Sequence, residues 1–212
     1  MLKKGQAYTE ADVPQMIVDE IAKNILRIQE TADWQGDTTS LSAYLSRYDG
    51  LCKIINAASG VVSATSSTFN STNARTIVKN IISNIPAALK GDPEVEIVMG
   101  YDAAEIYRQA LMDANLYHVA AGANFTDLYA EGSVHKIRAV HGLDTMYTQN
   151  TLPCIFALQW SNVFLGVDMQ NEEEQARMWV DGSDMETVKY RFAFRRGWQV
   201  AIPSEIVKYT NS

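Results

Sequence analysis

Residues 187–202, TVKYRFAFRRGWQVAI, alternate between two kinds of side chain over almost their whole length. One face is apolar and consists of Val188, Tyr190, Phe192, Phe194, Trp198, Val200 and Ile202. The other face is basic and polar and consists of Lys189, Arg191, Ala193, Arg195, Gly197, Gln199 and Ala201. This alternation predicts one antiparallel strand with a single buried face. At about 3.3 Å per residue the strand reaches roughly 50 Å, against about 17–20 Å for an ordinary strand. We therefore expect an elongated molecule whose remaining segments lie against this ribbon.

The composition allows a packed core. Of the 212 residues, 47% are hydrophobic and 20% are charged, which fits one large or two small domains. No run of eighteen apolar residues occurs, and residues 1–4 are followed by polar sequence. We therefore expect neither a membrane span nor a secretory signal, and a protein that stays where it is made. The net charge of −7 argues against a dedicated nucleic-acid binder.

Four segments have the apolar period of helices. The first runs from residue 12 to about residue 35 and carries a stripe of Val13, Ile17, Ile21, Ile25 and Ile28. The second covers residues 41–58 after a cap at Ser40, although Gly50 weakens it. A serine- and threonine-rich loop or loose hairpin at residues 59–73 separates it from the third helix, which begins after Thr72 or Asn73 and stops near Pro86. The fourth covers residues 103–114, with Asp102 and Glu105 as a capping box.

The remaining segments predict strands at residues 94–99, 134–140, 155–160, 163–167 and 176–180, and the ribbon ends at Pro203. The strands at 155–160 and 163–167 flank Ser161 and Asn162, which predicts a hairpin. Helices come early and strands late, so the order predicts an α+β protein with a largely antiparallel sheet.

We find no motif of a catalytic, cofactor or metal site. His118, His135 and His141 lack the spacing of a metal-binding pair. Cys52 and Cys154 lie in apolar surroundings and fit buried free thiols. We therefore expect no enzyme, no cofactor and no metal. The alternative from a different class is a small hydrolase that uses Cys154 or Cys52 with one of the three histidines.

Two charged segments are candidates for contacts between subunits. Residues 168–174 are acidic and predict an exposed turn, whereas the ribbon has a basic face. One interpretation is that the basic face meets the acidic turn of a neighbouring copy, and the other is that both are ordinary solvated surfaces. The residues of the candidate contact are Arg191, Arg195, Arg196, Glu172, Glu173 and Glu174.

Four stretches together resemble the major capsid proteins of tailed bacteriophages, which have the Hong-Kong-97-like fold. They are IPAALKGDPEVEIVMGYDAAEIYRQAL, NLYH, IFALQWSNVFLGVD and VKYRFAFRRGWQVAIPSEIV. The resemblance implies a long spine helix at residues 14–32, or in the following helix, and a long ribbon at residues 187–202. It implies a peripheral domain of residues 1–60 with 169–202, and an axial domain of residues 61–168 with 203–212. Family members carry an N-terminal arm and an extended loop before the spine helix, and neither is recognisable here; we expect a fragment or processed product, or a shell closed by other means.

The function that this resemblance implies is that of a structural subunit of a bacteriophage or prophage head. Copies would assemble into the hexamers and pentamers of an icosahedral shell around the genome, with scaffold and portal proteins as further partners. No membrane and no specific nucleic-acid binding is expected. The protein would be located in the virion, and in the bacterial cytoplasm before assembly. Two alternatives remain: the shell of an encapsulin-type nanocompartment with a groove for a cargo peptide, and an adaptor or other minor virion protein.

Overall fold

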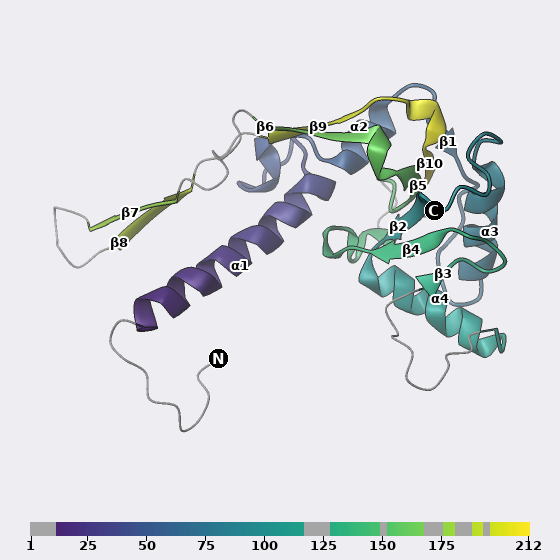
Figure 1. The fold of residues 1–212 in the computed structure, drawn as a ribbon, viewed down its shortest axis with the longest axis horizontal. Helices are drawn as coiled ribbons and strands as arrows, with labels where there is room; N and C mark the ends of the chain where they lie inside the picture. Colours follow the sequence, from purple (N-terminus) through teal and green to yellow (C-terminus); the bar gives the residue numbers. More distant parts are fainter. Residues whose placement is uncertain (1–11, 117–127, 149–151, 168–175, 181–187, 193–195) are drawn as a thin grey trace.

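The computed structural model describes residues 12–116, 128–148, 152–167, 176–180, 188–192 and 196–212 (Figure 1). A compact part surrounds a six-stranded sheet, and a long helix and two two-stranded ribbons extend from it (Figure 1). The molecule is therefore elongated, as the ribbon predicts. Among the described residues, no helix is both long and apolar enough to cross a bilayer.

Helix α1 (Asp12–Gln35) confirms the first predicted helix. Its last turns pack on the compact part, where Ala32 and Trp34 are buried. Farther from that end, Leu26 is 64% exposed and Ile28 is 47% exposed. The C-terminal end of α1 is therefore anchored, while much of the helix projects away from the core (Figure 1).

The predicted helix at 41–58 is wrong in its first half. This segment contains a short 3-10 turn, η1 (Leu45–Arg47), and helix α2 (Leu51–Ala57). The reason lies at Gly50, whose amide donates a hydrogen bond of 2.8 Å to the Gly36 carbonyl oxygen. A Cβ on Gly50 would lie 2.6 Å from the Trp34 carbonyl oxygen. The two backbone segments touch here, and α2 begins only after this contact.

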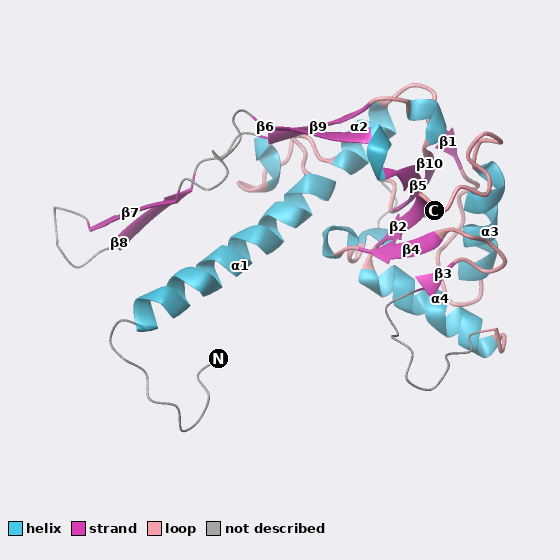
Figure 2. Ribbon diagram, in the orientation of Figure 1, coloured by secondary structure: helices cyan, strands magenta, loops and turns pink. Residues whose placement is uncertain are grey.

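The central sheet has six strands in the order β1, β10, β5, β2, β4, β3 (Figure 2). Strands β1 and β10 are parallel, as are β2 and β4, and the other neighbours are antiparallel. With the two antiparallel ribbons included, the strand pairs are largely antiparallel, so the predicted α+β class is confirmed. The strands of this sheet are β1 (Val62–Ser63), β2 (Val95–Met99), β3 (Leu128–Tyr129), β4 (Lys136–Ala139), β5 (Ile155–Gln159) and β10 (Val207–Tyr209).

Helices α3 (Ala74–Asn84) and α4 (Tyr101–Asp113) pack against each other and against the sheet. The predicted capping box of α4 is wrong, because the helix begins before Asp102. Instead, Asp144 Oδ1 accepts a hydrogen bond of 2.6 Å from the Tyr101 amide, and Glu105 pairs with Arg108. Asp144 comes from the turn after the 3-10 segment η2 (His141–Leu143); a further 3-10 segment, η3 (Met146–Thr148), follows.

The predicted hairpin at residues 161–162 is wrong. Strand β5 belongs to the central sheet, and after the turn η4 (Trp160–Asn162) strand β6 (Val163–Val167) pairs with β9 (Arg196–Val200). Asn162 fixes this departure, because its Nδ2 donates to the Ile202 carbonyl oxygen at 2.8 Å and its Oδ1 accepts from the Ile202 amide at 2.7 Å. The chain returns to the sheet through η6 (Pro203–Glu205).

The predicted single strand at residues 187–202 is two strands in different sheets. Strand β8 (Val188–Phe192) pairs with β7 (Ala176–Val180), while β9 pairs with β6. Residues 193–195 between them lie outside the described part. The predicted alternation holds within β9, where Val200 is buried and Gln199 is exposed.

The division into two domains stays a prediction. Leu51 and Ile55 of α2 belong to the same buried cluster as the central sheet. Strand β6 pairs with β9 rather than with the sheet that precedes it. These two segments connect the compact part to the projecting elements.

Candidate inter-subunit surface

Asp33 joins three elements at the point where α1, the segment before α2 and the β6–β9 ribbon meet. Its Oδ1 accepts hydrogen bonds from Tyr48 Oη at 2.7 Å and from Trp198 Nε1 at 2.9 Å. Arg196 Nε lies 3.3 Å from the same oxygen, and the Asp33 side chain is only 13% exposed. Burial, and then the hydrogen bond to Asp33, raises the pKa of Tyr48 above its ordinary value. The Asp33 carboxylate therefore connects the end of α1 with the segment before α2 and with β9.

Arg196 is a residue of the predicted contact whose side chain the structure describes. The side chain is 10% exposed, lies against Asp33, and its guanidinium carbon is 5.9 Å from the Trp198 ring centroid. Arg196 and Trp198 are two residues apart in β9, so they lie on the same face of the strand. The shared face of Arg196 and Trp198 could be inferred from their spacing in the sequence. Nothing in the sequence near Asp33, by contrast, indicates a contact with β9.

The other residues of the predicted contact are not brought together by the described structure. Arg191 lies in β8, in register with Arg177 of β7. Arg195 and residues 172–174 lie outside the described residues, so Glu172, Glu173 and Glu174 have no described position. The contact between the basic ribbon and the acidic turn of another copy stays a prediction.

We call Asp33, Tyr48, Arg196 and Trp198 the Asp33 cluster. A cavity of about 500 Å³ lies beside it. Glu96 holds two of the side chains around it, because it accepts a hydrogen bond of 2.6 Å from Trp160 Nε1 and one of 2.8 Å from Arg138 Nη2. The cavity lining combines tryptophan rings with charged side chains that are paired within this chain. The lining residues are Glu30, Asp33, Trp34, Leu51, Arg138, Val140, Trp160, Arg196 and Trp198.

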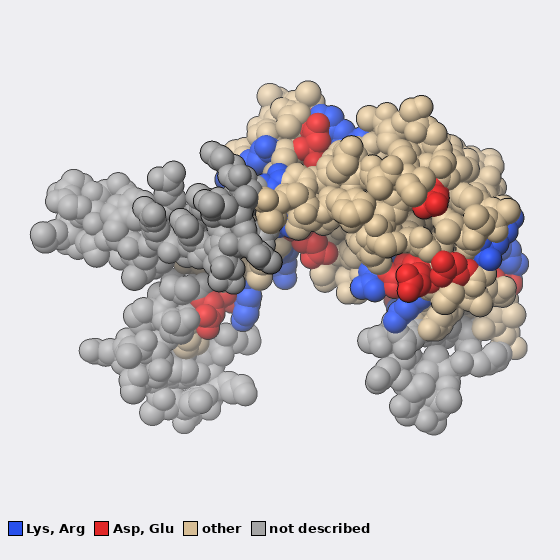
Figure 3. Space-filling model, turned by 45° about the horizontal axis from the view of Figure 1, so that its top comes forward, with Lys and Arg blue, Asp and Glu red and all other residues tan. Residues whose placement is uncertain are grey.

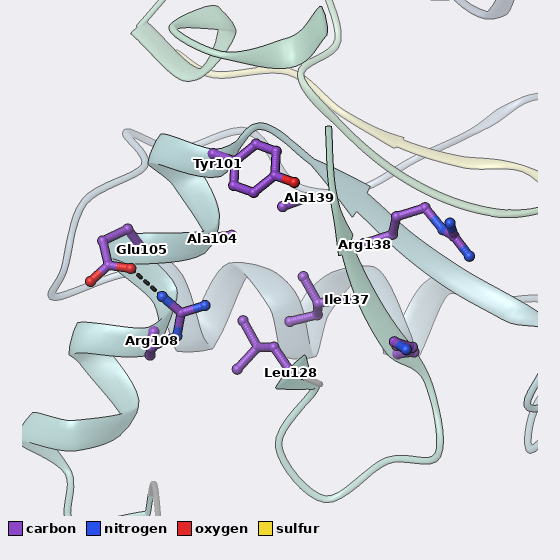
Figure 4. A pocket seen from close by; sticks show the side chains of 9 residues that line it. Tyr101, Ala104, Glu105, Arg108, Leu128, Ile137, Arg138 and Ala139 are labelled. Carbon is purple, nitrogen blue, oxygen red and sulfur yellow. Dashed lines mark hydrogen bonds and ion pairs between the residues drawn. The ribbon is translucent and has the colours of Figure 1, made fainter. Parts of the chain in front are cut away.

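A second pocket, of about 630 Å³, lies between α4 and the edge of the central sheet (Figure 4). Leu128 and Ile137 form an apolar floor, and Arg108 is paired with Glu105 at the rim (Figure 4). Arg138 points away from the pocket toward Glu96. Its described lining contains no histidine or cysteine, so it does not hold the cysteine and histidine of the hydrolase alternative.

The described thiols and histidines do not form a nucleophile–base pair. Cys52 and Cys154 are at most 1% exposed, and burial raises the pKa of both thiols, that of Cys154 to about 12. His135 Nδ1 lies 3.1 Å from the Val95 carbonyl oxygen. His141 Nδ1 lies 2.8 Å from Asp144 Oδ2, and His118 lies outside the described residues. Both thiols therefore stay protonated near neutral pH, where a nucleophile has to be a thiolate.

Glu131 connects α3 with the turn that follows β3. Arg75 donates to both of its carboxylate oxygens at 2.9 Å, and Lys79 Nζ lies 3.0 Å away. The hydrogen bonds from Arg75, and then those from Lys79, lower the pKa of Glu131 to about 2. No described group of three or more His, Cys, Asp and Glu side chains is arranged to hold a metal ion.

The charged side chains do not form a field of one sign on the face seen in Figure 3. Acidic and basic residues lie beside one another at several places around the border of the compact part, and much of the remaining described surface is uncharged (Figure 3). A nucleic-acid interface requires a continuous basic stripe. This face instead presents an uncharged surface with mixed charges at its border.

No protein-family model and no curated protein matches the chain. Among solved structures, a chain of the capsid of an empty GTA particle computed with C5 symmetry matches with a TM-score of 0.63 and 12% identity, over 99% of this chain and 68% of that chain. A chain of Gordonia phage Cozz matches with a TM-score of 0.58 and 13% identity, over 96% of this chain and 64% of that chain. The capsid of a native GTA particle, also computed with C5 symmetry, gives a TM-score of 0.57 and 14% identity, over 99% of this chain and 68% of that chain.

This likeness defines the fold. Nearly every residue of the chain takes part in the match, although the chain spans only 64% to 68% of the length of the three matched chains. The chain therefore has the fold of phage and GTA capsid subunits, and the resemblance found in the sequence is confirmed at the level of fold.

Proposed function

We propose that this chain is a structural subunit of a bacteriophage or prophage head and acts by packing many copies into a closed shell. The observation that carries the proposal is the fold shared with GTA capsid chains over 99% of this chain. The elongated form supports it, because a helix and ribbons that project from a compact part present long edges to neighbouring copies (Figure 1).

In this proposal the fold is the Hong-Kong-97-like fold and α1 is its spine helix. The projecting helix and ribbons form the peripheral domain, and the part around the central sheet forms the axial domain. Hexamers and pentamers of the chain build an icosahedral shell around the genome, with scaffold and portal proteins as partners. The protein is located in the virion, and in the bacterial cytoplasm before assembly.

The proposed subunit is not an enzyme and uses no cofactor. The buried, protonated thiols of Cys52 and Cys154 support this proposal, because a cysteine hydrolase needs an accessible thiolate beside a base. A broad panel of ester and amide substrates tests it. Activity that disappears in either Cys52→Ser or Cys154→Ser would contradict it.

The direct test is the size of the particles formed when the gene is expressed in bacteria. Sedimentation velocity and light scattering are expected to show closed particles or rings at high protein concentration. A dispersed monomer at every concentration is the contrary result. Neighbouring portal and terminase genes would identify a phage head, while a neighbouring cargo enzyme would identify a nanocompartment.

The charges of the ribbon and of residues 172–174 add a narrower proposal. Arg191 and Arg195 of one copy face Glu172, Glu173 and Glu174 of the next, and the pairing sets the register of the two copies more than their affinity. Arg196 takes no part, because its side chain is only 10% exposed and lies against Asp33 of its own copy. Each exposed pair contributes only about 0.2–1 kcal/mol.

Reversal of both arginines therefore leaves melting almost unchanged but impairs assembly. The variant is Arg191→Glu with Arg195→Glu, and adding Glu172→Lys with Glu173→Lys restores assembly in part. Normal assembly of the double arginine variant would show that these charges form only a solvated face.

A further inference from the structure

Strand β6 exposes an uncharged surface that the described residues of the chain leave open. It pairs with β9 along one edge, and no other described strand pairs with it. Phe164 is 54% exposed, Leu165 is 39% exposed and Val167 is 40% exposed. Open strand edges are usually protected by charged residues or proline, and the β6 sequence VFLGV has neither.

The two faces of the β6–β9 ribbon differ. Val163, Val200 and Trp198 belong to the face that packs on the buried core of this chain. Leu165 and Val167 lie on this same face, farther from the core and partly exposed. The opposite face consists of Phe164, Gly166, Gly197 and Gln199, and we call it the Phe164 face. It carries one large side chain next to a cross-strand pair of glycines. Because residues two apart in a strand are about 7 Å apart, Phe164 forms a ridge beside a strip of bare backbone.

Nothing within the described chain requires glycine at these two positions. Gly166 and Gly197 lie directly opposite each other in the ladder, and neither has a positive φ. A Cβ on Gly197 would meet no described atom within 4 Å, and one on Gly166 would meet only the Gly197 carbonyl oxygen at 3.7 Å. Glycine weakens a strand interior and often marks a place where another chain approaches closely. The glycine pair therefore points to a contact from outside the chain.

We propose that the Phe164 face binds the Phe164 face of a second copy of this chain across a two-fold axis. Phe164 of each copy lies over the Gly166–Gly197 pair of the other. A two-fold contact requires a surface that complements itself, and a ridge beside a notch meets that requirement. This inference rests on the proposed function, because it requires many copies to be brought together.

The Phe164 face is too small to hold two copies together without other contacts. A phenylalanine buries roughly 200 Å², so the exposed half of Phe164 supplies only about 100 Å². A stable dimer buries about 800 Å² on each partner. The Phe164 face therefore does not hold a dimer alone; it adds to the other contacts between copies in a shell.

Substitution of Phe164, which forms the ridge, and of Gly197, which forms part of the notch with Gly166, tests the contact. Phe164→Ala and Gly197→Leu are each expected to raise the concentration needed for assembly by about tenfold or more. Melting should not fall in either variant, since neither side chain contacts the buried core. The matched control is Leu41→Ala, which removes a similar amount of apolar surface from a residue that is 105% exposed. It should assemble within about twofold of the wild type.

Mixed cysteine variants test the geometry. Phe164→Cys and Gly197→Cys are purified separately, mixed in equal amounts, assembled and oxidised. The native thiols are buried, so we expect them not to form disulfides under these conditions. Disulfide-linked dimers are expected in the mixture and not in either variant alone, because a disulfide needs Cβ atoms about 3.5–4.5 Å apart. Loss of assembly in either cysteine variant with unchanged melting also supports the contact.

The outcomes separate this inference from the proposed function. If the wild type assembles, the ridge and notch variants assemble equally well, and the mixture gives no specific dimer, the Phe164 contact is wrong and the shell function stands. If the wild type forms no particles, the proposed function fails and the contact fails with it.

Discussion

Replacement of Asp33 by alanine removes the acceptor that connects the ribbon to the end of α1. Tyr48 Oη and Trp198 Nε1 then lose hydrogen bonds of 2.7 and 2.9 Å, and Arg196 loses a carboxylate 3.3 Å from its Nε. Asp33→Asn is the conservative variant, because it keeps an oxygen acceptor but removes the charge.

The expected loss follows from the burial of these groups. The Arg196 side chain is 10% exposed and that of Asp33 is 13% exposed, so water replaces their interaction only in part. Removing one partner of a buried ion pair typically costs about 3–5 kcal/mol, and a hydrogen bond to a charged group contributes about 1.5–3 kcal/mol. These contributions overlap because they share one oxygen. We expect Asp33→Ala to lower the free energy of unfolding by about 3–4 kcal/mol and Asp33→Asn by about 1–2 kcal/mol.

Urea unfolding followed by tryptophan fluorescence measures this loss. Near Tm, Asp33→Ala should melt about 10 °C lower for a chain of this size. The pKa of Tyr48, measured by ultraviolet titration, should move down toward its ordinary value because the Asp33 carboxylate contributes to its elevation. Glu94→Ala, at an exposed position, is the control and should stay within about 0.5 kcal/mol of the wild type. A loss below about 1 kcal/mol for Asp33→Ala, with the Tyr48 pKa unchanged, would mean that Asp33 does not hold these three elements together.

Three further predictions concern single sites. Gly50→Ala should lower the free energy of unfolding by about 2–4 kcal/mol, because its Cβ would lie 2.6 Å from backbone atoms of Trp34 and Gly36. Gly197→Ala, with no described atom within 4 Å of the added Cβ, should not lower it, and equal urea midpoints for the two variants would contradict this contrast. The pKa of Glu131 is lowered from 4.5 to about 2, so its contribution to stability is present above pH 4.5 and is lost as the pH falls toward 2; an NMR titration near 4.5 would disagree with this. Cys52 and Cys154 are at most 1% exposed and should react with a thiol reagent at pH 8 only after denaturation, whereas rapid labelling of the native protein would contradict their burial.

The sequence predicts best the elements whose buried positions follow from the pattern of apolar residues within the element itself. Helices α1 and α3 follow from isoleucines at helical spacing, and β2 follows from a short apolar run. Each of these patterns is local, so no distant contact was needed to interpret it. The segment at 41–58 also has a helical period, but the backbone contact between Gly36 and Gly50 prevents a continuous helix.

The sequence does not predict which strands pair, because pairing depends on segments that are far apart along the chain. Strands β5 and β6 are both apolar and close in sequence, yet β5 is buried in the central sheet while most of β6 is exposed. Asn162 separates them by binding the backbone of Ile202, and nothing near Asn162 indicates that partner. For the same reason, the sequence does not predict the hydrogen bond of Asp33 with Trp198 or that of Asp144 with the Tyr101 amide. The parity of Arg196 with Trp198 was the available signal, and it places the side chain of Arg196 on the Trp198 face of β9.

Negative-stain electron microscopy of the full-length gene product at high concentration shows whether this chain assembles into a shell. If the chain is a shell subunit, the images will show closed shells, or rings with five or six copies. Images of dispersed single molecules from an intact gene product, at concentrations where the protein is folded, would contradict the account.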